Sequence, residues 1–85
     1  YLSHLRIGMI YKKLEQKQFA AHSFQKAIKV CRICYQPVSE MAHYYLNTQK
    51  KEKAVDILKN FLRIKEITRA DRKSANKLLK LAYRL

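Results

Sequence analysis

The chain has 85 residues, of which 19 are Lys or Arg and 6 are Asp or Glu, so its formal net charge is +13 at pH 7. Hydrophobic residues make up 48% of it, with one Gly and one Pro, which excludes a disordered or linker-like segment and favours an all-α fold. No run of 18 apolar residues and no signal-peptide core is present, and the chain starts at Tyr1, so we expect a soluble domain excised from a longer protein.

The first expected helix, from about Leu2 to Leu14, has apolar residues on two faces. One face carries Ile7, Ile10, Tyr11 and Leu14, and the other carries Leu2, Leu5 and Met9. A helix with two apolar faces requires two neighbours. The second expected helix, from about Gln18 to Val30, supplies one neighbour through a stripe of Phe19, Ala20, Phe24, Ala27 and Ile28. The small Ala20 permits a close approach to Gly8.

A third and a fourth helix are expected between Pro37 and Leu62. Pro37 opens the third, which runs to about Leu46, because a proline in the first turn of a helix removes no helical hydrogen bond. The polar run 47–49 then predicts a turn. The fourth helix is lined by Ala54, Ile57, Leu58, Phe61 and Leu62.

A fifth helix is expected to start at Thr68, because Asp71 follows three residues later as in a capping box. Its expected buried stripe comprises Ala75, Leu78, Leu79, Ala82 and Tyr83, and its opposite face carries Lys73, Lys77, Lys80 and Arg84. Like charges at this spacing oppose helix stability unless an anion neutralises them. Two interpretations stay open for this basic face: a solvated outer surface, or a surface for an anionic partner.

Two parts of the chain match each other at a spacing of 34 residues. Gly8, Tyr11, Ala20, Phe24 and Ala27 recur as Ala42, Tyr45, Ala54, Leu58 and Phe61. The pattern resembles the tetratricopeptide repeat, since Ile7-Gly8-x2-Tyr11 with Ala20-x3-Phe24 and Met41-Ala42-x2-Tyr45 with Ala54-x3-Leu58 follow its small and aromatic positions. The resemblance implies antiparallel helix–turn–helix repeats stacked as a short right-handed superhelix. Repeats at 1–34 and 35–68 would precede a capping helix, or the first half of a third repeat, at 69–85.

In this family the first helices of successive repeats line a concave groove. Carried over by the 34-residue spacing, the groove would present Leu5, Met9, Lys12, Ser39, His43, Leu46, Lys73, Lys77 and Lys80. The resemblance therefore implies a non-catalytic scaffold that binds an acidic or partly apolar peptide or partner helix. A preceding repeat could instead cover Leu2, Leu5 and Met9, which would remove the apolar half of this groove.

Nucleic-acid binding is the alternative function, because a charge of +13 attracts phosphate. No helix–turn–helix, zinc-finger or RNA-binding strand signature supports it, and three of the six tyrosines, Tyr11, Tyr45 and Tyr83, fall on core stripes. A membrane surface is less expected, because no exposed Trp or Phe adjoins the basic faces. The charge thus predicts an anionic partner without choosing between a protein and a nucleic acid. We favour a peptide, because the 34-residue repeat builds a groove and nothing in the chain builds a base reader.

Cofactors, metals and catalysis find no support in the sequence. Cys31 and Cys34 form a Cys-x-x-Cys pair, but a zinc site needs two further ligands and none has the required spacing. We expect reduced, packed cysteines in a reducing intracellular compartment, the cytoplasm or nucleus. No phosphate-binding loop, nucleophile elbow or metal-binding His motif is present, so we expect neither an enzyme nor a small-molecule substrate.

Overall fold

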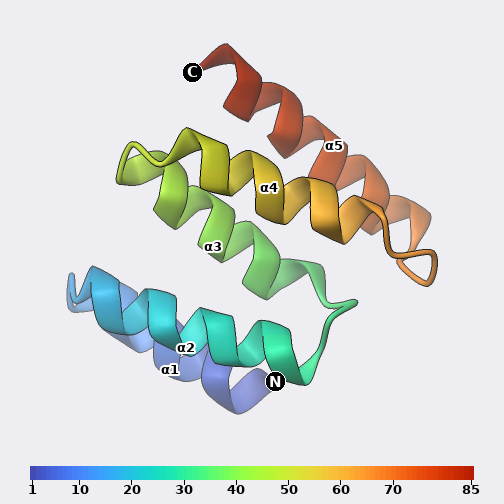
Figure 1. Cartoon of the computed structure of the whole chain (residues 1–85). Helices are drawn as coiled ribbons and strands as arrows, with labels where there is room; N and C mark the ends of the chain where they lie inside the picture. The colour runs from blue at the N-terminus through green and yellow to red at the C-terminus, as the bar shows by residue number, and fades with distance from the viewer.

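The computed structural model describes all of residues 1–85 and is built of helices alone. They are α1 (Leu2–Lys13), α2 (Lys17–Val30), α3 (Tyr35–Asn47), α4 (Lys51–Leu62) and α5 (Arg69–Arg84). The helices stack in chain order, each antiparallel to the one before, so that α1 and α5 lie at opposite ends (Figure 1). The stack measures 31 × 28 × 16 Å. The all-α prediction is confirmed, and none of the helices combines the length and apolarity of a membrane span.

The helix boundaries follow the expected signals. Thr68 caps α5, because its Oγ1 accepts a hydrogen bond from the Asp71 amide at 3.0 Å. Pro37 lies in the first turn of α3, where its missing amide proton costs no helical bond. The expected ends of the repeats, at 34 and 68, fall immediately before α3 and α5. That division into repeats, and the right-handed superhelix, stay interpretations.

The α1–α2 and α3–α4 turns are the same structure repeated 34 residues apart. Glu15 and Gln49 both adopt a left-handed backbone, with φ of 61° and 60°. The amide after each residue donates back to a tyrosine carbonyl, from Gln16 to Tyr11 at 2.8 Å and from Lys50 to Tyr45 at 2.7 Å. This bond satisfies a carbonyl at the end of the helix, as in a Schellman motif. The repeat is therefore present in the backbone as well as in the side chains.

Two apolar clusters form the core. The first comprises Leu5, Ala20, Ala21, Phe24, Ala27 and Met41, and the second comprises Val38, Ala42, Ala54, Leu58, Phe61, Ile67, Ala75 and Leu78. Met41 extends from α3 into the first cluster and is fully buried. The half-buried Ile28, Tyr45 and Ile57 pack against both clusters. Each helix pair therefore shares its core with the next pair, as repeat proteins do.

The structure corrects which face of α1 is covered. Leu5 is 5% exposed in the first cluster and Met9 is half-buried, so the chain itself covers this part of the face that a preceding repeat was expected to cover, while Leu2 is 50% exposed. The other apolar face is open, since Ile7, Ile10 and Leu14 are 45%, 57% and 63% exposed. In α5 the expected core residue Tyr83 is exposed as well. Spacing alone marks apolar faces but does not say which of two faces meets a neighbour.

Gly8 lies directly under the Phe24 ring. A Cβ at position 8 would lie 2.6 Å from Phe24 Cε1 and 2.7 Å from Cδ1, which is too close for any real contact. Phe24 is fully buried, so its ring has little room to move. The equivalent positions in the second repeat hold Ala42 and Leu58. Ala42 is larger than Gly8, and Leu58 is smaller than Phe24. Each pair thus fills a similar space in a different way.

We predict that the effect of Gly8→Ala on the free energy of unfolding changes sign with the residue at position 24. In the natural chain it should destabilise, because overpacking costs about 1–3 kcal/mol against a helix-propensity gain of about 1 kcal/mol. In a Phe24→Leu background the clash is relieved, and Gly8→Ala should then stabilise by up to about 1 kcal/mol. Urea unfolding of the two single variants and the double variant measures both effects. Equal effects of Gly8→Ala in the two backgrounds would contradict this packing account.

Candidate functional site

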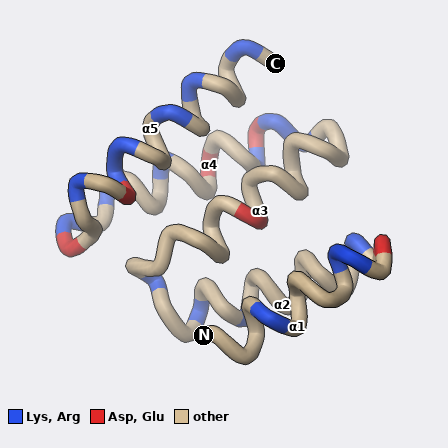
Figure 2. The backbone as a smooth tube through the Cα atoms, turned by 180° about the vertical axis from the view of Figure 1, so that it is seen from behind, with Lys and Arg blue, Asp and Glu red and all other residues tan.

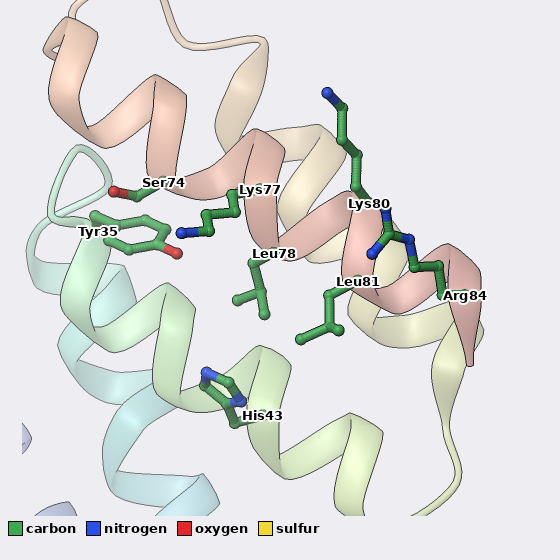
Figure 3. A pocket seen from close by; sticks show the side chains of 8 residues that line it. All are labelled: Tyr35, His43, Ser74, Lys77, Leu78, Lys80, Leu81 and Arg84. Carbon is green, nitrogen blue, oxygen red and sulfur yellow. The ribbon is translucent and has the colours of Figure 1, made fainter.

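A hollow of about 590 Å³ lies between α3 and α5. We call it the α3–α5 cleft, and it is lined by Tyr35, His43, Ser74, Lys77, Leu78, Lys80, Leu81 and Arg84 (Figure 3). Lys77 points toward Tyr35, while His43 points from α3 toward α5. Leu78 and Leu81 point toward α3. The cleft therefore has an apolar floor with basic groups around it.

The cleft is positive and its cations are unpaired. Its lining contains Lys77, Lys80 and Arg84 but no Asp or Glu. None of these three cations has a carboxylate within ion-pair distance, because the structure holds a single ion pair elsewhere. An unpaired cation beside apolar side chains attracts a carboxylate more strongly than one in bulk water does.

Tyr35 contributes a hydroxyl to the α3–α5 cleft. Burial raises the pKa of its phenol above the ordinary value of 10.0, and the charge of Asp71 adds to the rise, while a side-chain hydrogen bond with Ser39 opposes it. The net direction is upward, so Tyr35 is protonated at neutral pH and its hydroxyl can donate a hydrogen bond to an anionic ligand.

A smaller hollow of about 90 Å³ continues this face toward α1 and α2. It is lined by Lys12, Lys17, Ala20, Phe24, Glu40, His43, Tyr44 and Asn47. The charge of Glu40 in this hollow is already neutralised, because Lys12 Nζ lies 2.9 Å from Glu40 Oε2. His43 lines both hollows and therefore joins them into one surface. We call the joined surface, made by α1, α2, α3 and α5, the groove.

The structure brings together only some of the residues predicted for the groove. Lys12 and His43 line the smaller hollow, and His43, Lys77 and Lys80 line the α3–α5 cleft. Leu5 is a correction: it is buried in the first core cluster, because α2 and Met41 cover it, and it cannot contact a ligand. The remaining predicted residues, Met9, Ser39 and Leu46, are half-buried.

Lys73 lies on a different surface. It lines a second hollow of about 610 Å³ on α5 together with Arg69, Arg72, Asn76, Lys77 and Lys80, and none of these residues is apolar. Figure 2 shows Lys and Arg along the whole length of α5, whereas α3 carries none. The basic face of α5 therefore borders the groove on one side and a wholly polar surface on the other.

The predicted groove did not include five residues that line the cleft: Tyr35, Ser74, Leu78, Leu81 and Arg84. Arg84 follows Lys80 by four residues and Leu81 follows Lys77 by four, so helical spacing could have placed both beside the predicted lysines. Tyr35 had no such signal. Its place depends on the angle between α3 and α5, which the 34-residue spacing does not encode.

Arg72 is a structural base despite its position on the basic face. Its guanidinium donates to the carbonyl oxygens of Leu62 at 2.8 Å and Ile64 at 3.0 Å. These carbonyls belong to the end of α4 and the turn after it, which have few helical partners. Arg72 thereby joins α5 to the end of α4, and its charge is largely committed within the chain.

The cysteine prediction was wrong. Cys31 and Cys34 form a disulfide across the α2–α3 turn, with an S–S distance of 2.02 Å, and no cysteine is free. The sequence could not show this, because a Cys-x-x-Cys pair fits a disulfide, a metal half-site or two thiols. The reducing compartment stays a prediction. No group of three or more His, Cys, Asp and Glu side chains is arranged to hold a metal ion.

Comparison with known proteins gives one match. Residues 1–34 match the sequence model of the tetratricopeptide repeat. No match was found among the curated proteins or among the solved structures. Tetratricopeptide repeats generally mediate protein–protein interaction and are typically non-catalytic scaffolds. The matched residues contain α1, α2 and the turn that leads to α3.

We predict that Arg72→Ala lowers stability by about 1–3 kcal/mol, because two charge-assisted hydrogen bonds to carbonyls are lost. The control is Lys73→Ala, which removes a neighbouring exposed base and should change stability by less than about 0.5 kcal/mol. Urea unfolding measured on both variants makes the comparison. Equal effects of the two substitutions would show that the bonds of Arg72 add nothing to stability.

Proposed function

The chain is a tetratricopeptide-like helical repeat, and from this premise we propose that its groove binds an acidic peptide or partner helix that also carries apolar side chains. The α3–α5 cleft is the main contact in this proposal. The chain would act as a non-catalytic scaffold that holds its partner in place. The ligand class follows from the composition of the cleft rather than from the family.

The observation that carries this proposal is an apolar floor surrounded by unpaired cations. Leu81 is 46% exposed on the floor, while Lys77 and Arg84 stand at the edge without a carboxylate partner. Burying an apolar side chain of a ligand against Leu81 contributes about 25 cal/mol per Å². Carboxylates of the same ligand would gain charge-assisted hydrogen bonds from the cations. The cleft therefore favours Asp or Glu next to Leu-like residues.

The groove imposes a direction on such a ligand. At the α1 end Lys12 already pairs with Glu40, so a carboxylate there gains less than it does in the α3–α5 cleft. Lys17 of α2 is the one cation of the smaller hollow without an acid beside it, whereas Lys77, Lys80 and Arg84 of α5 lie together in the α3–α5 cleft without one. We expect the acidic part of the ligand against α5, with its less charged part running over His43 toward α1.

Phosphate binding by α5 is the second candidate, favoured by the wholly polar hollow that includes Arg69, Lys73 and Asn76. A nucleic acid would contact this hollow through its phosphates and would not need the apolar floor of the cleft. Lys77 and Lys80 line both hollows, so the two candidates differ in Arg69, Lys73 and Asn76 on one surface and in Leu81 and Arg84 on the other. Substitutions on either surface can separate them.

We predict that Lys77→Glu weakens binding of an acidic peptide by at least about tenfold, whereas Lys73→Glu weakens it by about twofold or less. The two variants make the same charge change on one helix, but only Lys77 lines the α3–α5 cleft. The probe is a fluorescein-labelled peptide in which Leu alternates with pairs of Glu, measured by fluorescence anisotropy. Leu81→Ala should weaken binding too, because the floor loses apolar area.

Two controls separate the candidates. A peptide of the same composition in shuffled order should bind more weakly if apolar and acidic residues must meet the floor and edge together. Single-stranded RNA of random sequence should bind weakly, with equal losses for Lys73→Glu and Lys77→Glu. Tight RNA binding that falls steeply with salt and ignores Leu81→Ala would favour the second candidate.

A further inference from the structure

The Cys31–Cys34 disulfide lies between the two apolar clusters of the core. Cys31 is the residue after α2 and Cys34 is the residue before α3, with their Cα atoms 5.5 Å apart. The bond therefore ties the end of one helix pair to the start of the next. Its sequence separation of 3 closes a small loop, which restrains the unfolded chain less than a long loop does. Its position indicates a local role at the start of α3.

The start of α3 lacks a hydrogen bond that the other helices have. Each of the other four helices begins with an amide that donates to the carbonyl of the residue before the helix, over 2.9 to 3.2 Å. The pairs are Leu5 to Tyr1, Ala20 to Gln16, Ala54 to Lys50 and Arg72 to Thr68. The Cys34 carbonyl accepts no such bond, and the one backbone bond between residues of this turn runs from the Cys34 amide to the Cys31 carbonyl at 3.3 Å. The disulfide is therefore the main link that the turn provides between α2 and the first turn of α3.

Tyr35 connects this link to the α3–α5 cleft. It follows Cys34 directly as the first residue of α3, and its side chain forms one wall of the cleft (Figure 3). Its ring also lies 5.6 Å from the Phe61 ring of α4. The rest of α3 is held independently, because Val38 and Met41 are buried in the core clusters. Opening the disulfide would therefore loosen the wall of the cleft without removing α3 from the stack.

The disulfide is accessible to a thiol. Both cysteines are half-buried, and Arg32 and Ile33 between them are exposed. Cys34 also lines a hollow of about 370 Å³, together with Ile67 and Thr68 from the end of the α4–α5 turn. Exposed disulfides are reduced more easily than buried structural ones and include the labile and regulatory ones. In the reducing compartment expected from the sequence, such a bond would be transient.

We propose that the Cys31–Cys34 disulfide is a reversible redox site, opened by a small monothiol, and that its state sets the affinity of the α3–α5 cleft through Tyr35. The thiolate of the monothiol attacks the Cys34 sulfur and forms a mixed disulfide with it, while the electron pair of the broken bond goes to the Cys31 sulfur. A second monothiol thiolate then attacks the monothiol sulfur of the mixed disulfide and releases Cys34 as a thiolate. The two cysteine thiolates take up the protons that the two monothiols lost. The monothiols are thereby oxidised to a disulfide, and the protein disulfide is reduced to two thiols.

The effect on the cleft rests on the proposed function, whereas the redox step does not. In the oxidised chain Tyr35 is held where its hydroxyl can donate to an acidic ligand. In the reduced chain the first turn of α3 is in place for only part of the time, and the apparent affinity falls in proportion to that fraction. A fraction of about one third would weaken binding about threefold.

The redox step is tested on the full chain with reduced glutathione as the monothiol. The oxidised chain is equilibrated with excess glutathione, free thiols are blocked with iodoacetamide, and the intact mass counts the blocked cysteines. We expect both cysteines of the folded chain to become free with unchanged helical circular dichroism, because the buried core holds the helices. A bond that opens only in urea, or a chain that loses its helices on reduction, would overturn the proposal, because the bond would then be structural.

The link to the cleft is tested with the fluorescein-labelled peptide of Leu and Glu. Reduction should weaken its binding at least about threefold, and the double variant Cys31→Ser, Cys34→Ser should match the reduced chain. The matched control is glutathione added to this double variant, which should change nothing, because the chain has only these two cysteines. In a Tyr35→Ala background reduction should no longer change binding, because the wall through which the disulfide acts is gone.

A measurement without ligand separates failure of this proposal from failure of the proposed function. Amides of residues 38–40, at the start of α3, should exchange with deuterium faster in the reduced chain, because the first turn is no longer held. If the oxidised chain binds the peptide, equal affinity after reduction would overturn the proposal. If neither form binds the peptide, the groove function fails, faster exchange at 38–40 would still support the redox site, and equal exchange would overturn it.

Discussion

Close approach of neighbouring helices at small side chains is the constraint on which the whole stack depends. Ala20 and Ala27 on α2, Ala54 on α4, and Ala75 on α5 are at most 3% exposed, and each lies where two helices meet. Short side chains at these positions allow backbones to pack closely and keep the stack only 16 Å thick. Longer side chains must then point toward the groove or the outer faces. The binding surfaces are therefore a consequence of how tightly the helices pack.

Much of the fold could be predicted, because its determinants are local or periodic. Thr68 with Asp71 signals a cap, Pro37 signals a first turn, and the 34-residue spacing pairs Tyr11 with Tyr45. The covered face of α1 could not be predicted, since both faces have apolar residues at helical spacing. Leu5 was assigned to the wrong environment for that reason. A pattern identifies candidate contact faces, while the choice between them depends on where the next helix lies.

The candidate site was less predictable than the fold, because like residues at like spacing serve different purposes. Arg72 and Lys73 are adjacent bases on α5, yet the first donates to the end of α4 while the second is exposed. Lys12 and Lys77 were both assigned to the groove, and only the first has an acid beside it. Net charge is a sum over all bases, so it cannot show which cations are free for a partner. That distinction requires the positions of carbonyls and carboxylates from distant parts of the chain.

The division of the core into two clusters has a consequence for how the molecule opens. The cluster of α1 and α2 joins the other one through Met41 and a few half-buried side chains, because contacts in a linear stack reach only to neighbours. Helices at the ends of such a stack can separate without disrupting the middle. Backbone amides of α3 and α4 should therefore exchange with deuterium more slowly than those of α1, with protection falling toward the ends.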